Sequence, residues 1–205
     1  MIIKSFELAK IDLKKNNFFL FYGENEGFKK QVIEEKFKKL FKENTYLYDE
    51  NEIIQNETDF FNKILSKSFF DNEKLIIITR VTDKVKNIIE EVLEKNIDDI
   101  ILVLNAGALE KKSKLRGLFE KGKSVICVPF YEDNNQTLSA IVSKFFRDND
   151  IPISQQSINL IAQRCRGDRL NLKNELEKIQ SFTKNKSKIK VGDLRKLTNL
   201  SENYS

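Results

Sequence analysis

The chain has 205 residues, 40% of them hydrophobic and 33% charged, and 36 basic against 31 acidic residues give a net charge of +5. Two prolines and seven glycines are too few for a disordered or fibrous chain, and the apolar runs are too short for a membrane-spanning helix. With no His and only two cysteines, a Ser-His-Asp set, a Cys-His set, His-ligated zinc and a four-thiolate metal site are all excluded. We expect no catalytic residue, no metal and no cofactor.

The first 130 residues alternate between apolar runs that suit buried strands and apolar residues at helical spacing. Strands are predicted at 17–22, 45–48, 74–80, 99–104 and 124–128, and helices at 28–41, 60–65, 85–93 and 111–121. Because the runs are apolar on both faces, they indicate an α/β fold with a parallel sheet covered by helices. Cys127 lies in the last apolar run and is expected to be a core thiol.

After Pro129 the pattern changes, and no further strand is predicted. Helices are predicted at 138–146, from an N-cap at Ser154 to a stop at Gly167, at 172–182 and at 191–197. The chain is therefore expected to consist of an α/β domain over 1–130 and a small helical domain over 131–205.

The loop after the first strand is a candidate anion site, because a strand-to-helix turn aims backbone N–H groups at a ligand. Its sequence is YGENEGFKK over residues 22–30, which aligns Gly23 and Lys29 with the phosphate-binding pattern G-x-x-x-x-G-K-[ST]. Phe28 replaces the second glycine, and Lys30 replaces the hydroxyl residue that would hold magnesium. We expect this loop not to function in nucleotide hydrolysis, and Lys29 to be a surface or interface charge.

Two adjacent aromatic residues occur in the segment KSFFDN, between the helix at 60–65 and the strand at 74–80. Phe69 and Phe70 cannot both face inward from one short turn in ordinary geometry, so at least one is expected to be exposed as an interface anchor. The alternative is that both rings pack under the edge of the sheet.

Basic residues gather in the helical domain at Arg164, Arg166, Arg169 and Lys173, with alternating lysines over 184–190. Such a set can follow a phosphate backbone, and it is equally compatible with a solvated helix face.

Three segments together make the chain resemble the delta subunit of the bacterial DNA polymerase III clamp loader. RGDRLNLKNELEKI, residues 166–179, looks like the family's lid helix, and Lys67 to Phe70 fall where the family carries its clamp-gripping element. Residues 113–116, SKLR, resemble the segment after the third core strand. The match covers essentially the whole chain.

The resemblance implies an AAA+-like α/β domain with a defective phosphate loop, followed by a helical lid domain. It implies a subunit that does not hydrolyse ATP but belongs to a DNA-directed DNA polymerase complex, acting in the bacterial cytoplasm at the nucleoid during replication. The implied partners are a sliding clamp, the other subunits of a hetero-oligomeric ring and primer-template DNA, with no membrane. Phe69, Phe70, Ser68 and Leu65 would bind the clamp.

The chain departs from the family in two respects. Members carry a third, helical collar domain that is missing here, so the chain is expected to be a fragment or a natural truncation. Leu170 and Asn171 stand where active AAA+ relatives carry a nucleotide-sensing arginine, with Arg169 out of register. Two alternatives stay open: a P-loop ATPase or other nucleotide-binding protein with an atypical loop, and a free-standing basic nucleic-acid-binding protein.

Overall fold

The structure is a computed structural model, and it describes residues 1–41, 44–66, 73–95 and 97–183. The chain divides into two units, Met1–Tyr131 and Glu132–Ser205, one residue away from the expected boundary. In the described residues, no helix is long and apolar enough to cross a membrane.

The centre of the first unit is a parallel sheet. Within the described residues it has five strands, which are β1 (Phe18–Tyr22), β2 (Thr45–Asp49), β3 (Lys74–Val81), β4 (Ile100–Ala106) and β5 (Ile126–Pro129). Their order is β2-β3-β4-β1-β5, and each neighbouring pair is parallel. Every residue of β1 is buried, whereas β2 at the edge is partly exposed. The prediction of a parallel sheet made from doubly apolar strands is confirmed.

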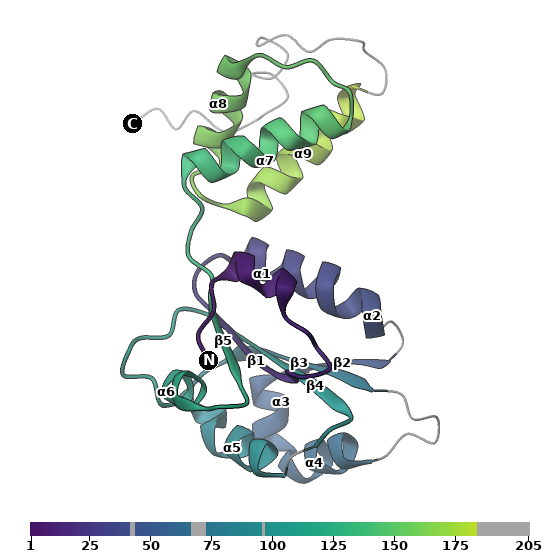
Figure 1. Cartoon of the computed structure of the whole chain (residues 1–205), viewed down its shortest axis with the longest axis vertical. Helices are drawn as coiled ribbons and strands as arrows, with labels where there is room; N and C mark the ends of the chain where they lie inside the picture. The colour runs from purple at the N-terminus through teal and green to yellow at the C-terminus, as the bar shows by residue number, and fades with distance from the viewer. Residues whose placement is uncertain (42–43, 67–72, 96, 184–205) are drawn as a thin grey trace. The chain divides into compact units, whose positions relative to one another are not determined.

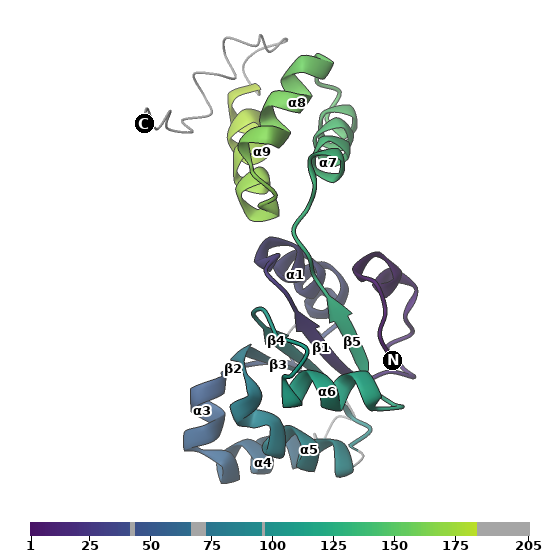
Figure 2. The ribbon, with the colours of Figure 1, turned by 90° about the vertical axis from the view of Figure 1, so that its left-hand side faces the viewer.

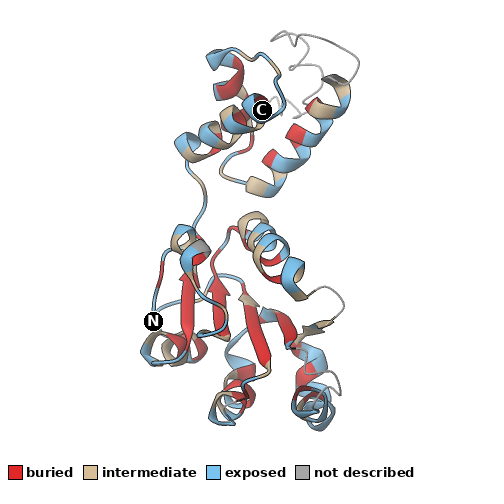
Figure 3. Cartoon of the chain, turned by 45° about the vertical axis from the view of Figure 1, so that its right-hand side comes forward, coloured by how far each residue is buried: buried red, intermediate tan, exposed pale blue. Residues whose placement is uncertain are grey.

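Helices cover both faces of this sheet (Figures 1 and 2). One face carries the 3-10 helix η1 (Ser5–Lys10), α1 (Glu26–Val32), the π-helical η2 (Ile33–Lys38) and α2 (Lys39–Phe41). The other carries α3 (Glu50–Gln55), α4 (Glu57–Leu65), the 3-10 turn η4 (Asp83–Val85), α5 (Lys86–Glu94) and α6 (Lys114–Lys121). Each layer encloses its own apolar cluster, and Figure 3 shows the buried strands between helices whose outer faces are exposed.

Local chemistry explains where the helices differ from the predicted ranges. The short helix α3 was not predicted; it begins at a capping box in which Asp49 and Glu52 satisfy each other's backbone N–H groups. The helix predicted from residue 111 begins at Lys114, because Ser113 is its N-cap and accepts from the backbone N–H of Arg116. Cys127 is a core thiol as expected, and burial raises its pKa to about 12.

The second unit contains α7 (Asn135–Asp148), α8 (Gln155–Arg164) and α9 (Arg169–Thr183) among its described residues. The three helices share one apolar cluster that includes Val142, Ile161 and Leu172. Ser154 caps α8 as predicted, and Gly167 takes a φ of +80° in the turn before α9. The helix predicted at 191–197 lies outside the described residues.

Candidate functional site

The loop between β1 and α1 lies where the carboxyl ends of three parallel strands meet. The backbone N–H of Gly23 donates to the carbonyl of Gly107, which follows β4, and Gly23 has a φ of +119°. A Cβ added at Gly23 would lie 2.2 Å from the carbonyl oxygen of Phe130, which follows β5. Only glycine fits this position, as in a phosphate-binding loop. Asn25 then caps α1 by accepting from the N–H of Phe28 at 3.0 Å.

Lys29 is fully buried beneath this loop, which corrects the expectation of a surface charge. Its Nζ donates to the carbonyl of Gly23 at 2.8 Å and to the carbonyl of Ala106, and it forms an ion pair with Glu26 at 2.5 Å. Burial lowers the pKa of Lys29, and the hydrogen bond and charge of Glu26 act in the opposite direction. A lysine ammonium has three N–H donors, and these three acceptors match that number.

The other two substituted positions of the loop differ in environment. Phe28, where the pattern has its second glycine, is half-buried and packs edge-on against Phe130 with the ring centres 5.2 Å apart. Lys30, where the pattern has its magnesium-binding hydroxyl, is exposed. The loop thus keeps the first glycine and the lysine of a phosphate loop, while Lys29 closes it from inside and a packed ring adjoins it.

Acidic residues near the carboxyl ends of β2 and β3 are also engaged within the fold. Asp49 forms a 2.6 Å ion pair with Arg80, whose φ is 58°. Glu50 is buried and accepts from the N–H and the hydroxyl of Thr82. Asp83 accepts from the first turn of α6. Among the residues described, no three His, Cys, Asp or Glu side chains are grouped so that they could hold a metal ion.

The predicted clamp-binding element lies largely outside the described residues, which include Leu65 but not Ser68, Phe69 or Phe70. Leu65 is the last residue of α4 and is 45% exposed, whereas Phe60 and Ile64 of the same helix are buried.

Lys74 joins the two ends of this element, a feature that the sequence interpretation missed. It is the first residue of β3 and is buried, and its Nζ donates to the carbonyls of Lys63 and Ser66 at the end of α4. A cation at the carboxyl end of a helix satisfies its terminal carbonyls and opposes the negative end of the helix dipole. The end of α4 and the start of β3, which flank residues 67–72 in the sequence, are therefore bonded to each other.

The predicted DNA-contacting residues of the second unit do not share one environment. The guanidinium of Arg169 forms two hydrogen bonds with the carboxylate of Asp133, at 2.6 and 2.8 Å, and both side chains are almost buried. Arg166 and Lys173 are exposed, and Lys173 lies 3.8 Å from Glu177. Arg164 is half-buried. Arg169 is therefore engaged inside the second unit. A phosphate contact by Arg164, Arg166 and Lys173 stays a prediction.

Comparison with known proteins gives a fold and no family. A scan of family models and a search of curated proteins found no match. The solved Bacillus subtilis DNA clamp loader delta protein has a TM-score of 0.57 and 16% identity to this chain, with 96% of this chain and 63% of that one covered. The Thermotoga maritima RuvB Holliday junction branch migration motor has a TM-score of 0.58 and 14% identity to this chain, with 88% of this chain and 60% of that one covered. Domain III of the Thermotoga maritima replication initiation protein DnaA has a TM-score of 0.51 and 11% identity, with 95% of this chain and 88% of that one covered.

These similarities confirm the predicted fold class, which is AAA+-like, with a parallel sheet and helices on both of its faces. The chain spans less than two thirds of the length of the Bacillus subtilis and RuvB proteins.

Proposed function

We propose that the chain is a delta-type clamp-loader subunit that binds a sliding clamp and helps to open it for loading onto primed DNA. The observation that carries the proposal is the buried Lys29, whose three donors are engaged within an AAA+-like domain. An AAA+-like domain with this lysine bound internally suits a subunit that transmits force within a ring and does not hydrolyse ATP. The sequence resemblance and the similarity to the Bacillus subtilis protein support the same function.

In this proposal the element after α4 binds the clamp. Phe69 and Phe70 would enter an apolar pocket of the clamp, with Leu65 and Ser68 beside them, and Lys74 would hold the stems of the element together. Burying two phenyl rings contributes roughly 3–6 kcal/mol before ordering costs. Binding alone opens nothing, because a ring opens only if the subunit has a higher affinity for the open form than for the closed form.

A binding titration against the cognate clamp tests the proposal. The double change Phe69→Ala/Phe70→Ala is expected to weaken submicromolar binding about 100-fold, the equivalent of about 2.8 kcal/mol. A matched control is Phe6→Ala/Tyr131→Ala, which removes two aromatic rings that are 69% and 72% exposed elsewhere in the first unit. The control should bind like the wild type, and equal losses in the two variants would contradict the proposal.

The first alternative, a nucleotide-binding ATPase, needs Lys29 to leave its internal acceptors and reach a phosphate. It predicts nucleotide binding by the wild-type chain that is lost in Lys29→Met. We propose instead that neither the wild type nor Lys29→Met binds ATP. An equilibrium titration with a fluorescent ATP analogue measures this directly.

A further inference from the structure

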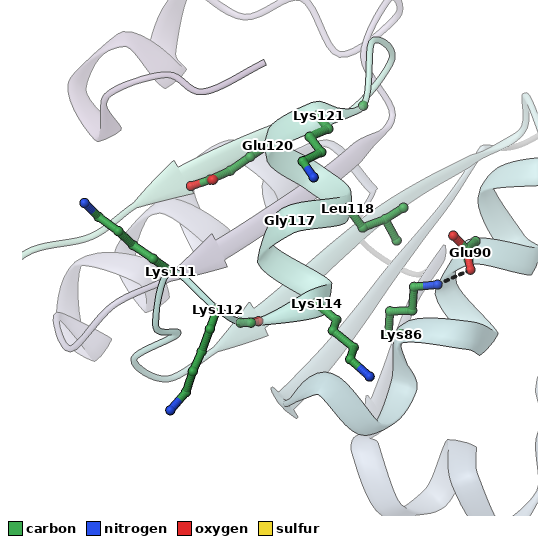
Figure 4. Close-up of a pocket in the computed structure, with 11 residues that line it drawn as sticks. Lys86, Glu90, Lys111, Lys112, Lys114, Gly117, Leu118, Glu120 and Lys121 are labelled. Atoms are coloured by element: carbon green, nitrogen blue, oxygen red, sulfur yellow. Dashed lines mark hydrogen bonds and ion pairs between the residues drawn. The ribbon is translucent and has the colours of Figure 1, made fainter.

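A basic groove lies between α5 and α6 (Figure 4). It is open, has a volume of about 720 Å³, and extends over the loop that precedes α6. Its charged lining residues are Lys86, Lys111, Lys112, Lys114, Lys121, Glu90 and Glu120. Five positive charges against two negative ones give the lining a local excess of 5 − 2 = +3.

Only part of this positive charge is neutralised nearby. Lys86 pairs with Glu90, and Lys112 pairs with Glu110 at 3.0 Å. Glu120 is paired with Arg116 at 2.7 Å and not with a lysine of the groove. For Lys111 and Lys121, the described residues provide no ion pair. Lys114 has a through-space attraction to Asp83 and no ion pair within the same described ranges.

The groove is held by a fixed scaffold. The carboxylate of Asp83 accepts from the hydroxyl of Ser113 at 2.6 Å and from the N–H groups of Lys114 and Leu115, both at 3.0 Å. These bonds lower the pKa of Asp83, with that from Ser113 the largest cause. Arg116 donates to the carbonyl of Leu109 and so ties the loop to the helix. The start of α6 is thus bonded from within the chain, and the lysine side chains are left as the binding groups of the groove.

The directions of the lysines indicate the size of the ligand. Figure 4 shows the side chains of Lys111, Lys112 and Lys114 extending from the ribbon in different directions, and Lys121 further along α6. One small anion cannot touch ammonium groups that diverge in this way. An extended polymer with repeated negative charges can, and duplex DNA carries one charge per about 1.7 Å of its axis.

The composition of the lining distinguishes DNA from an acidic protein. Protein interfaces are depleted in lysine and enriched in arginine and aromatic anchors, whereas this groove has five lysines, no aromatic residue and Leu118 as its large apolar side chain. The lack of an aromatic lining also disfavours single strands, whose bases stack on such rings. We propose that the groove between α5 and α6 binds the phosphate backbone of duplex DNA without reading its sequence.

The test measures binding of the full chain to a fluorescent 24-base-pair duplex over a series of salt concentrations. The test variant is Lys111→Gln/Lys114→Gln/Lys121→Gln. The control, Lys10→Gln/Lys14→Gln/Lys39→Gln, makes the same change of charge at exposed lysines of η1, of the turn that follows η1, and of α2. The groove variant should bind at least 10-fold more weakly, and its plot of log affinity against log salt should be shallower by about two to three. The control should keep the slope of the wild type.

Two results would overturn the proposal. Equal losses in the groove variant and the control would mean that diffuse charge attracts the DNA, and undetectable binding by the wild type at 50 mM salt would mean that the groove has another ligand. Circular dichroism verifies that both variants are folded. Because no clamp is present, this test is independent of the proposed clamp binding and can fail separately from it.

Discussion

Lys29 is the residue whose hydrogen bonds hold the β1–α1 loop in place. Its ammonium bonds the carbonyl of Gly23, six residues earlier, and that of Ala106, 77 residues later. It therefore joins the ends of β1 and β4, and Glu26 provides the opposite charge that makes burial of the ammonium tolerable. In a phosphate loop that holds a nucleotide, the charge opposite the lysine comes from the phosphates, whereas in this structure Glu26 supplies it.

Lys29→Met tests this role because it keeps the length of the side chain and removes the donors. Two carbonyls lose a buried donor, so the free energy of unfolding should fall by about 2 kcal/mol. Urea denaturation measures the change. Lys30→Met, at the exposed neighbour, is the control and should stay within about 0.5 kcal/mol of the wild type. A Lys29→Met protein as stable as the wild type would show that the hydrogen bonds of the Lys29 ammonium do not stabilise the fold.

The position of Lys29 was not predictable from the sequence. A lysine after a glutamate-rich loop is ordinarily a surface charge, and its burial depends on a carbonyl of β4 far along the chain. Lys74 is a similar case, because its acceptors belong to α4 and the residue that follows it. The long buried strands were predictable because their apolar runs are local properties of the sequence.

At the scale of elements, two glycines show how differently the β1–α1 loop and α6 are constrained. Gly23 has a positive φ and no space for a Cβ, because the carbonyl oxygen of Phe130 would lie 2.2 Å away. Gly117 lies inside α6, where an added Cβ would meet no atom within 4 Å. The same substitution should therefore have opposite effects at the two positions.

Gly23→Ala is expected to destabilise the protein by at least about 2 kcal/mol, because it adds both strain and a clash with backbone. Gly117→Ala should stabilise it by about 0.5–1 kcal/mol, since alanine favours a helix over glycine. Thermal and urea unfolding of both variants beside the wild type measure the difference. A tolerated alanine at Gly23 would mean that the loop is not held against Phe130.

Elements were also unequally predictable. The capping-box sequence at Asp49 to Glu52 was a local signal for α3 that the periodicity analysis missed, because six residues are too short for an apolar stripe. The basic groove had no such signal, since it depends on α5 and α6 packing side by side. Of the candidate site, the sequence predicted the first glycine and the lysine of the loop, but not the bonds that close it.

At the scale of the whole molecule, we propose that an AAA+-like domain, in which Lys29 is bonded internally, carries an element after α4 that binds a clamp and a basic groove that binds DNA. The chain covers 63% of the Bacillus subtilis clamp loader delta protein in the structural match, so its behaviour in a complete ring is part of the proposal. The proposed clamp contact and the proposed DNA groove involve different residues of the first unit. Substitution of Phe69 and Phe70 is therefore expected to leave DNA binding unchanged, and substitution of the groove lysines is expected to leave clamp binding unchanged.

The most direct test of the account is a titration of the chain against two forms of the cognate sliding clamp. One form has its ring interface intact, and the other carries a substitution in that interface that prevents closure. A subunit that opens the ring should bind the form that cannot close at least 10-fold more tightly, which is about 1.4 kcal/mol, and Phe69→Ala/Phe70→Ala should weaken both. Equal affinity for the two forms, or no binding to either by a folded chain, would contradict the account.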